Sequence, residues 1–585
     1  MPTRTRRLAR KWSVSPSQPE RALRLAKALS VSPILAQLLI NRGVEDPAAA
    51  GTFLRTRLDH LHDPFLLKEM HKAVDRILRA LRDNEKILVF GDYDVDGVTG
   101  TTLMVQFFRT LGREIGWYIP HRIDEGYSLS RAAVEKFAKD GIKVLITVDC
   151  GTSSIEEVRV AQELGVDVIV TDHHEPMSVL PPALAVLNPK TQNSGYPFLG
   201  LCGVGMAFKL VWAVAKAMHG PNRISGPLSR FFVESMALVS LGTIADVAPL
   251  VGENRIFATF GLAALGSSKL PGLQALLRAA GLEGTPLNAG HVGFRLGPRL
   301  NAGGRMGSAG IGVELLLTGS HERAKDIVDD LEAANQERQR IEAEILQQAH
   351  EMVEREHDLE NDPVIVLADD RWHSGVIGIV ASKLAETHYR PTFLIALHGE
   401  RGKGSGRSIP ALHLYEALTS CKDLLMAFGG HSHAAGLEVA RDKVPLLRRR
   451  INDSARGVLK ADDLVPRLTI DMEVLLESLT REAVREIQLL EPHGYGNPGP
   501  VLSSANLRLA GDPKIIGKTG DHMSFYVTQG KSSLKAIAFG MADRYEELLA
   551  HRRSPFSLAF APIVNEWQGR ESVELQVKDL RFDPE

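Results

Sequence analysis

Short apolar runs followed by acidic residues form the clearest pattern in this chain. The first run, residues 87–90, precedes three carboxylates at alternate positions, Asp92, Asp94 and Asp96. A run of this kind is typical of a buried strand, and open α/β sheets place their sites beyond the carboxyl ends of the strands. Three carboxylates so close together repel one another strongly unless cations lie among them. The pattern therefore predicts a cation site at the end of a strand.

The pattern recurs at residues 143–148 and 166–171, and a fourth run, residues 240–245, resembles it. The residues that follow these runs are Asp149, Asp172, His173, His174 and Asp246. An acidic surface loop is the alternative interpretation, and the recurrence disfavours it. Carboxylates with one or two imidazoles suit Mn²⁺ or Mg²⁺. A site with enough ligands for two ions is typical of phosphoester hydrolysis.

The periodicity of the apolar positions divides the chain into five segments. β-like runs alternate with helical stretches in two of them, which indicates mostly parallel sheets with helices on their faces. The fold class is α/β: two α/β lobes joined by a long helix, plus a C-terminal small β-barrel. We expect an N-terminal helical extension over residues 1–80, a catalytic domain over 81–318, a connecting helix over 319–361, a second α/β domain over 362–460 and the barrel over 461–585.

The connecting segment begins near Ser320, is almost free of Gly and Pro, and is dense in Glu, Arg, Gln and Ala. It predicts one helix of about 50 Å, at 1.5 Å per residue. Arg338 interrupts the apolar repeat. This interruption disfavours an intermolecular coiled coil and favours a rigid connector between two lobes.

The C-terminal segment shows short β-like pieces separated by Gly and polar turns, which suits a small barrel. Lysines and arginines alternate there with aromatic residues, a mixture that suits a surface for phosphates and stacked bases. The alternative is that the aromatic residues form the core. Those aromatic residues are Phe525, Tyr526, Phe539 and Trp567.

Composition narrows the class of protein further. The chain has 585 residues, 44% hydrophobic and 24% charged, with a net charge of −2, so any nucleic-acid contact needs a local basic patch. Three widely spaced cysteines indicate a reducing compartment. No stretch approaches eighteen uninterrupted apolar residues, so no membrane span is expected. We expect a cytoplasmic protein.

Several blocks of this sequence resemble one known superfamily. Asp172-His173-His174 is similar to the signature triplet of the DHH phosphoesterases, and FGDYDVDGVTGT (90–101) looks like their first motif in the form used by RecJ exonucleases. Further blocks resemble RecJ proteins in the same order: VDCGTS (148–153), GTIADVAPL (242–250), RLNAGGRMG (299–307), WHSGVIGIVASKL (372–384), GKGSGRS (402–408) and GGHSHAAGL (429–437).

The resemblance implies a set of metal ligands. In the superfamily the ions are held by residues that match Asp94, Asp96, Asp149, His173 and Asp246, with Asp149 as the bridge. Many members carry a His at the position of Phe90, and Asp92 takes its place here. Asp172 and His174 are expected to act beside these ligands or on the phosphate, because a carboxylate next to a ligating imidazole fixes its tautomer.

The resemblance also implies a pocket for a 5′-phosphate. Ser405 and Arg407 lie among glycines in GKGSGRS, where a backbone can approach a phosphate and a guanidinium can bind it bidentately. A solvated turn is the alternative interpretation of this block. The other candidates for substrate contact are Arg122, Arg299, Arg305, His431 and His433, of which the two histidines belong to a motif similar to that of the DHHA1 domain.

The function implied is a metal-dependent 5′→3′ exonuclease. It would degrade single-stranded DNA to 5′-mononucleotides by two-metal phosphodiester hydrolysis, in DNA repair and recombination, with an OB-fold in the C-terminal segment. Single-strand DNA-binding protein and other repair factors are the partners implied. One alternative is a DHH phosphoesterase for pyrophosphate, cyclic dinucleotides or short oligonucleotides, although those proteins are usually much shorter. The other is a non-catalytic nucleic-acid-binding scaffold, which the retained acids disfavour.

Overall fold

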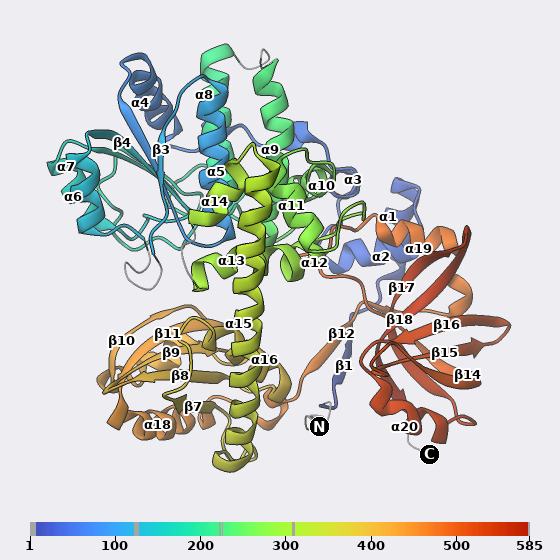
Figure 1. Cartoon of the computed structure of the whole chain (residues 1–585). Helices are drawn as coiled ribbons and strands as arrows, with labels where there is room; N and C mark the ends of the chain where they lie inside the picture. Colours follow the sequence, from blue (N-terminus) through green and yellow to red (C-terminus); the bar gives the residue numbers. More distant parts are fainter. Residues whose placement is uncertain (1–7, 122–127, 221–223, 225, 307–309, 583–585) are drawn as a thin grey trace. The chain divides into compact units, whose positions relative to one another are not determined.

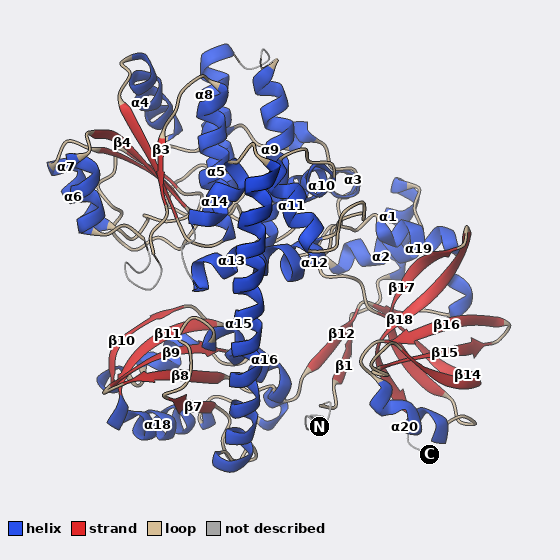
Figure 2. Cartoon of the chain, viewed as in Figure 1, coloured by secondary structure: helices blue, strands red, loops and turns tan. Residues whose placement is uncertain are grey.

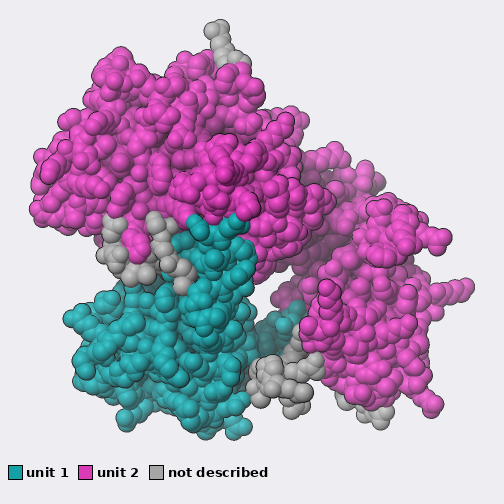
Figure 3. Space-filling view, in the orientation of Figure 1, with its two compact units in different colours: residues 1–12, 302–308, 329–468 teal, residues 13–301, 309–328, 469–585 magenta. Residues whose placement is uncertain are grey.

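The computed structural model describes residues 8–121, 128–220, 224, 226–306 and 310–582. It separates into two compact units, coloured differently in Figure 3. The larger unit contains residues 13–301, 309–328 and 469–585, and the smaller contains residues 1–12, 302–308 and 329–468. Each unit is described by itself below.

A five-stranded parallel sheet lies at the centre of the first half of the larger unit (Figure 2). The three predicted strands are confirmed as β2, β4 and β5, and they lie side by side. Because all pairings are parallel, the residues that follow these strands meet at one edge. The strand order is β3 (Gly116–Tyr118), β2 (Lys86–Gly91), β4 (Ile142–Val148), β5 (Asp167–Thr171) and β6 (Ala185–Leu187).

Helices cover this sheet (Figure 1). One layer, α6 (Arg131–Lys139) and α7 (Ile155–Glu163), shares a core with the strands through side chains such as Phe137, Val158 and Val168. Other helices pack against one another beside the sheet. They are α4 (Met70–Arg82), α5 (Val95–Thr110), α8 (Gly203–His219), α9 (Pro227–Ala245) and α10 (Gly252–Gly266).

The run 240–245 is not a strand, and this corrects the sequence interpretation. It forms the last part of α9, so Asp246 follows a helix. A short apolar run does not distinguish a buried strand from a buried helix, and α9 is apolar because it packs against α5, α8 and α10.

By length and composition alone, α9 is apolar enough to cross a membrane, and 67% of its most apolar window is buried inside the protein. Two bent helix pairs meet the same criteria only as pairs: α1 (Pro19–Leu29) with α2 (Pro33–Asn41), and α10 with α11 (Pro271–Ala279).

The N-terminal helices and the C-terminal barrel share one hydrophobic core. Leu25, Leu35 and Leu39 of α1 and α2 belong to the same buried cluster as Phe525 and Phe556 of the barrel. Helix α3 (Pro47–Leu54) contributes Ala50 to it, and α19 (Arg481–Gln488) contributes Val484 and Ile487. The two ends of the chain therefore stabilise each other by burying apolar surface in common.

The barrel closes as predicted. Strand β14 pairs with both β15 and β17, and the order is β13 (Met472–Glu473), β14 (Leu502–Ile516), β15 (His522–Gln529), β16 (Ser532–Ala538), β18 (Arg570–Phe582) and β17 (Phe556–Trp567). Of the four aromatic residues named above, one belongs to the core and three lie on the surface, where they could stack with bases. Phe525 is buried in the core, whereas Tyr526, Phe539 and Trp567 are exposed.

The smaller unit holds the second α/β domain. Its sheet has the order β10 (Leu425–Gly430), β11 (Ala434–Ala440), β9 (Arg401–Arg407), β8 (Thr392–His398) and β7 (Ile365–Asp369). The helices are α16 (Ile377–His388), α17 (Leu414–Thr419) and α18 (Val444–Arg456). The predicted long helix is confirmed as α15 (His321–Glu356).

The block GKGSGRS is a strand and not a solvated turn. It forms most of β9, between β8 and β11. Its glycines face a packed core, because a Cβ on Gly402, Gly404 or Gly406 would lie 2.4–2.8 Å from a side chain of a neighbouring strand. Ser405 and Arg407 occupy the alternate positions of β9 and therefore point to the opposite face.

A buried ion pair holds together the helical layer of the larger unit. Lys209 Nζ lies 2.5 Å from Glu253 Oε1 and donates to His62 O at 2.8 Å, while Tyr196 donates to Glu253 Oε2 at 2.6 Å. Burial lowers the pKa of Lys209 to about 8, and Glu253 opposes that shift. The pair connects α8, α10 and two loops.

We expect Lys209→Ala to lower the free energy of unfolding by about 3–5 kcal/mol, because it leaves the Glu253 carboxylate buried without its cation. Denaturant unfolding measures this. The matched control is Lys72→Ala, which removes an exposed lysine paired with Glu69 and should change stability far less. Equal stability of the two variants would contradict the assignment.

Candidate metal centre

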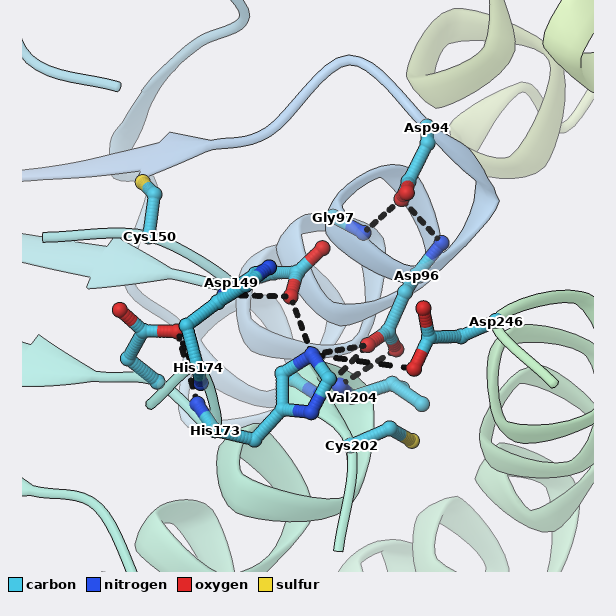
Figure 4. A network of polar contacts seen from close by, with 12 residues as sticks. Asp94, Asp96, Gly97, Asp149, Cys150, His173, His174, Cys202, Val204 and Asp246 are labelled. Atoms are coloured by element: carbon cyan, nitrogen blue, oxygen red, sulfur yellow. Dashed lines mark hydrogen bonds and ion pairs between the residues drawn. The ribbon is translucent and has the colours of Figure 1, made fainter. Parts of the chain in front are cut away.

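Asp94 and Asp96 are fixed where β2 passes into α5 (Figure 4). The Asp94 carboxylate caps the helix, accepting from Asp96 N at 2.8 Å and Gly97 N at 3.2 Å. The Asp96 carboxylate accepts from Gly203 N at 2.6 Å and Val204 N at 2.8 Å. Those two N–H groups begin α8, and the start of a helix favours negative charge. Backbone donors therefore hold both carboxylates.

Asp149 directly follows β4 and has a φ of 63°, in the left-handed region. Its N–H donates to Thr171 O at 2.9 Å, which continues the pairing with β5. Gly203 lies against it, since a Cβ at this glycine would be 2.4 Å from Asp149 Cβ. A non-glycine residue in this conformation is held by its surroundings and is common at functional sites.

The Asp172 carboxylate organises the DHH triplet. It accepts from Thr152 N at 2.9 Å, His173 N at 2.7 Å and His174 N at 3.1 Å, and lies 2.7 Å from His174 Nδ1. Asn188 supports the same segment by donating to His174 O at 2.8 Å. The Asp172 carboxylate therefore orients His173 and His174.

His173 is the meeting point of three carboxylates (Figure 4). Its Nε2 lies 3.0 Å from Asp149 Oδ1, 3.8 Å from Asp96 Oδ2 and 3.7 Å from Asp246 Oδ2. No hydrogen bond within the described residues satisfies this buried nitrogen. A buried imidazole nitrogen that faces several carboxylates is the arrangement expected of a metal ligand.

The cluster offers three groups of ligand atoms that lie within 4.8 Å of one another. Asp149 belongs to two groups, and His173 also belongs to two. The groups are Asp149 with His173 and His174; Asp96 with His173 and Asp246; and Asp92 with Asp94 and Asp149. The donor set of carboxylates and imidazoles fits Mn²⁺ or Mg²⁺, and the shared members make it suitable for more than one ion.

The ionised carboxylates of the cluster repel one another, and protons or cations relieve that repulsion. Burial raises the pKa of Asp149 well above its usual range, and the nearby acids raise it further. Burial and the charge of Asp94 raise the pKa of Asp96 to about 7, and burial together with Asp96 also raises that of Asp246. Burial and the adjacent His174 lower the pKa of His173 to about 3. The imidazole is therefore neutral, as metal ligation requires.

Asp172 and His174 behave differently. Burial would raise the pKa of Asp172, but the hydrogen bond and charge of His174 hold it well below its usual range. Burial would lower the pKa of His174, and Asp172 raises it beyond its ordinary value. The two side chains form an ion pair beside the cluster.

Sequence reasoning missed the residues that set the spacing of the cluster. A Cβ on Gly97 would lie 2.4 Å from Asp92 O, and one on Gly242 would lie 2.9 Å from Asp96 Oδ1. Gly203 and Asn188 lie outside the quoted motifs, and their contacts with the cluster were also missed. Gly97 and Gly242 stand inside the quoted motifs, which was the available signal.

The candidates for phosphate contact are more dispersed. Arg407 donates to Ser405 Oγ at 3.0 Å, and both lie against the start of α16, where a Cβ on Gly378 would be 3.0 Å from Ser405 Oγ and 3.2 Å from Arg407 Nη2. Arg305 donates to Gly375 O at 2.9 Å, two residues before that helix. These residues share the smaller unit.

The remaining candidates are placed as follows. His431 and His433 are exposed in the turn between β10 and β11. Arg299 lies in α13 (Gly297–Met306) and belongs to the larger unit, where it donates to Arg295 O at 2.7 Å. Arg122 lies outside the described residues.

Comparison with known families defines the class of protein. The DHH family, N-terminal domain, matches residues 86–238; the DHHA1 domain matches residues 361–457; and the RecJ OB domain matches residues 470–579. The fold and the acidic site are thus those of a DHH protein with DHHA1 and OB domains.

Individual relatives identify the family. The single-stranded-DNA-specific exonuclease RecJ of Bacillus subtilis (strain 168) is 36% identical over 571 residues, 97% of this chain and 70% of that protein. RecJ of Dickeya dadantii is 36% identical, covering 94% of this chain and 96% of that protein. The crystal structure of Thermus thermophilus RecJ in complex with Mn²⁺ has a TM-score of 0.81 and 32% identity, covering 98% of this chain and 80% of that chain. The chain belongs to the RecJ family.

We expect Gly203→Ala to weaken Mn²⁺ binding about tenfold, the size of effect seen when the support of a metal ligand is disturbed, because the new methyl group would displace Asp149. Calorimetric titration of Mn²⁺ measures this. Gly205→Ala is the control in the same helix, since its Cβ would come no closer than 3.3 Å to a leucine side chain. Unchanged Mn²⁺ affinity in a folded Gly203→Ala protein would exclude the assigned contact.

Proposed function

We propose that this protein is a metal-dependent exonuclease that degrades single-stranded DNA from the 5′ end to 5′-mononucleotides, with Mn²⁺ or Mg²⁺ at the acidic cluster. The convergence of Asp92, Asp94, Asp96, Asp149, His173 and Asp246 at one sheet edge carries the proposal. The names of its RecJ relatives support it, as do the Mn²⁺ and Mg²⁺ complexes of the Thermus thermophilus protein.

The ligand residues have distinct tasks. Asp149 would ligate both ions, because it belongs to two groups of ligand atoms and its carboxylate, unlike the His173 ring, offers two oxygen atoms to them. Asp96 and Asp94 are aligned by backbone N–H groups, so the site is already ordered for its cations. When bound, two such ions activate a water molecule as the nucleophile and neutralise the phosphate in the transition state.

Asp172 and His174 act on the position and charge of the substrate. Asp172 fixes the His174 ring through Nδ1. The raised pKa of His174 favours the imidazolium form, which suits an anionic phosphate next to the cluster. Asp172 acts as a positioning residue through His174.

Recognition of the 5′ end is assigned to the smaller unit. Ser405 and Arg407 form one polar face of β9 beside the start of α16. A guanidinium, a hydroxyl and the N–H groups at the start of a helix together suit a terminal phosphate. Arg305 is placed near them by its bond to Gly375. Arg122, Arg299, His431 and His433 remain candidates for contact with the rest of the strand.

The barrel is proposed to bind the strand beyond the active site. Tyr526, Phe539 and Trp567 offer exposed rings for base stacking. A deletion of the barrel would test this poorly, because it would expose the core shared with α1 and α2. A cytoplasmic location, a role in repair and recombination, and contacts with single-strand DNA-binding protein and other repair factors are further proposals that follow from the family.

The alternatives are less well supported. An enzyme for small phosphoesters would not require the long helix α15 or the OB domain, which matches residues 470–579. A non-catalytic scaffold would not require a complete set of acids and imidazoles at the sheet edge. Digestion of single-stranded DNA labelled at either end, with Mn²⁺ or Mg²⁺, tests the proposal. Release of the label from the 3′ end first would contradict the polarity.

We expect Asp149→Asn to reduce cleavage by at least about 10³-fold, as removal of a shared metal ligand should. The metal-free variant should remain folded, and its stability should fall less than that of the wild type as pH rises, since Asp96 and Asp246 still have raised pKa values. The reason is that the raised pKa of Asp149 means that its ionisation opposes folding. Initial rates and thermal unfolding measure the two effects. Turnover above one tenth of wild type would contradict the metal assignment.

We expect Arg407→Ala to lower the preference for 5′-phosphorylated over 5′-hydroxyl ends about tenfold, the loss expected for one charge-assisted contact. The rate at saturating metal on 5′-hydroxyl substrate should change little. Arg401→Ala is the control, since Arg401 begins the same strand on the same face. The same ratio of rates in both variants would show that Arg407 does not recognise the end.

A further inference from the structure

We infer that the loop between α19 and β14, residues 489–501, positions Asp246 and thereby links the C-terminal barrel to the metal centre. The inference rests on the proposed function in one respect, that Asp246 is a metal ligand. The observation that motivates it is a set of close contacts between this loop and the ten residues that begin with Asp246. All of these residues belong to the larger unit.

Asp246 lies where the chain turns sharply out of α9. Its N–H still donates to Gly242 O at 2.9 Å, but Val247 has a φ of 58° and is 64% exposed. A β-branched residue is unfavourable in the left-handed region. A conformation of this kind persists only where neighbouring contacts hold it. The next four residues, 248–251, must therefore be anchored.

The loop supplies one anchor. Leu250 N donates to Tyr495 O at 2.7 Å, four residues after Asp246. The backbones approach so closely that a Cβ on Gly496 would lie 2.9 Å from Pro249 Cβ, and one on Gly494 would lie 2.6 Å from Leu250 Cδ1. Gly496 also has a φ of 75°, which favours glycine. Glycine at these two positions allows the loop to hold the segment.

The loop is itself rigid. Gly494 and Asn497 exchange backbone hydrogen bonds of 2.9 and 3.1 Å. The fully buried Asn497 side chain donates to Leu490 O at 2.7 Å and Pro492 O at 3.0 Å, and accepts from Arg42 Nε at 3.0 Å. A loop with its polar groups satisfied in this way can transmit a position rather than absorb a displacement.

Arg255 supplies the second anchor. It lies in α10, nine residues after Asp246, and donates to Leu490 O at 2.8 Å, Leu489 O at 2.9 Å and Glu491 O at 2.8 Å. A fourth bond, of 2.9 Å, reaches Phe53 O at the end of α3. The segment 246–255 is therefore held to the loop at Leu250 and at Arg255.

The loop continues into α19 on one side and β14 on the other, and both contribute to the core of the barrel. A displacement of the barrel would thus reach the backbone of Pro249 and Leu250, and from there Asp246. The consequence is that the barrel contributes to metal affinity, although none of the candidate ligand groups found among the described residues includes a barrel residue.

The test is Gly496→Ala in the full-length protein. We expect its Mn²⁺ affinity, measured by calorimetry without DNA, to fall about tenfold, as for other supports of a metal ligand. Hydrogen exchange at the Leu250 amide should accelerate. Affinity for single-stranded DNA in EDTA should stay within about twofold of wild type, and excess Mn²⁺ should restore most of the rate.

Two glycine variants separate this effect from general strain. Gly499→Ala lies in the same loop, and its Cβ would come no closer than 3.6 Å to His493. Gly511→Ala introduces a side chain at a φ of 77° with no atom within 4 Å. Both should retain wild-type Mn²⁺ affinity, and the second should still lower the unfolding temperature.

The outcomes are distinct. Wild-type Mn²⁺ affinity in Gly496→Ala, together with faster exchange at Leu250, overturns the inference. If Gly496→Ala does not fold, Arg255→Lys replaces it, because lysine keeps the charge but lacks the planar guanidinium that bonds four carbonyl groups here. Wild-type Mn²⁺ affinity in that variant has the same meaning. Asp246→Asn is the reference. Wild-type Mn²⁺ affinity in that variant refutes the metal assignment of Asp246, and with it the inference. If only Asp246→Asn loses Mn²⁺ affinity, Asp246 remains a metal ligand, and the positioning role of the loop is refuted.

Discussion

Mutual repulsion among buried carboxylates is the constraint on which the rest of this structure depends. Asp96 and Asp149 are almost completely inaccessible to solvent. Burial and the charge of Asp94 raise the pKa of Asp96, and burial and the charge of Asp96 raise that of Asp149. Such an arrangement opposes folding unless protons or cations neutralise it. The structure holds the carboxylates together with backbone donors from two helices and with glycines that allow close approach. The free energy of unfolding is lowered when no cation is bound, but the carboxylates are held in an order that suits cations.

The two neighbouring histidines of the DHH triplet have pKa values shifted in opposite directions. His173 faces the acids with an unprotonated nitrogen, whereas His174 is held by Asp172 in a form that favours the proton. One imidazole is suited to a metal, and the other to a phosphate. Burial and the charge of His174 lower the pKa of His173, whereas that of His174, which burial alone would lower, is raised by its hydrogen bond with Asp172.

Segments that are far apart in the sequence pack against one another in the larger unit. The helices α1 and α2 share a core with the barrel, and Arg255 bonds to carbonyl groups from both the N-terminal and C-terminal regions. The residues that follow Asp246 lie within this network. The candidate metal centre is therefore connected, through described contacts, to parts of the chain outside its candidate ligand groups.

The sequence by itself determined the three strands that end in acids, the long helix and the order of the family blocks, because each depends on local periodicity or on adjacent residues. Only the tertiary structure decided that Asp246 follows a helix, that GKGSGRS is a central strand, and that Phe525 is buried while Tyr526 is exposed. An apolar run is compatible with a buried helix or a buried strand, and a glycine-rich block with a turn or a packed strand. The choice is made by partners far away in the chain. The contacts of Gly203 with Asp149 and of Gly496 with Pro249 belong to the same class, since they join residues separated by tens or hundreds of positions.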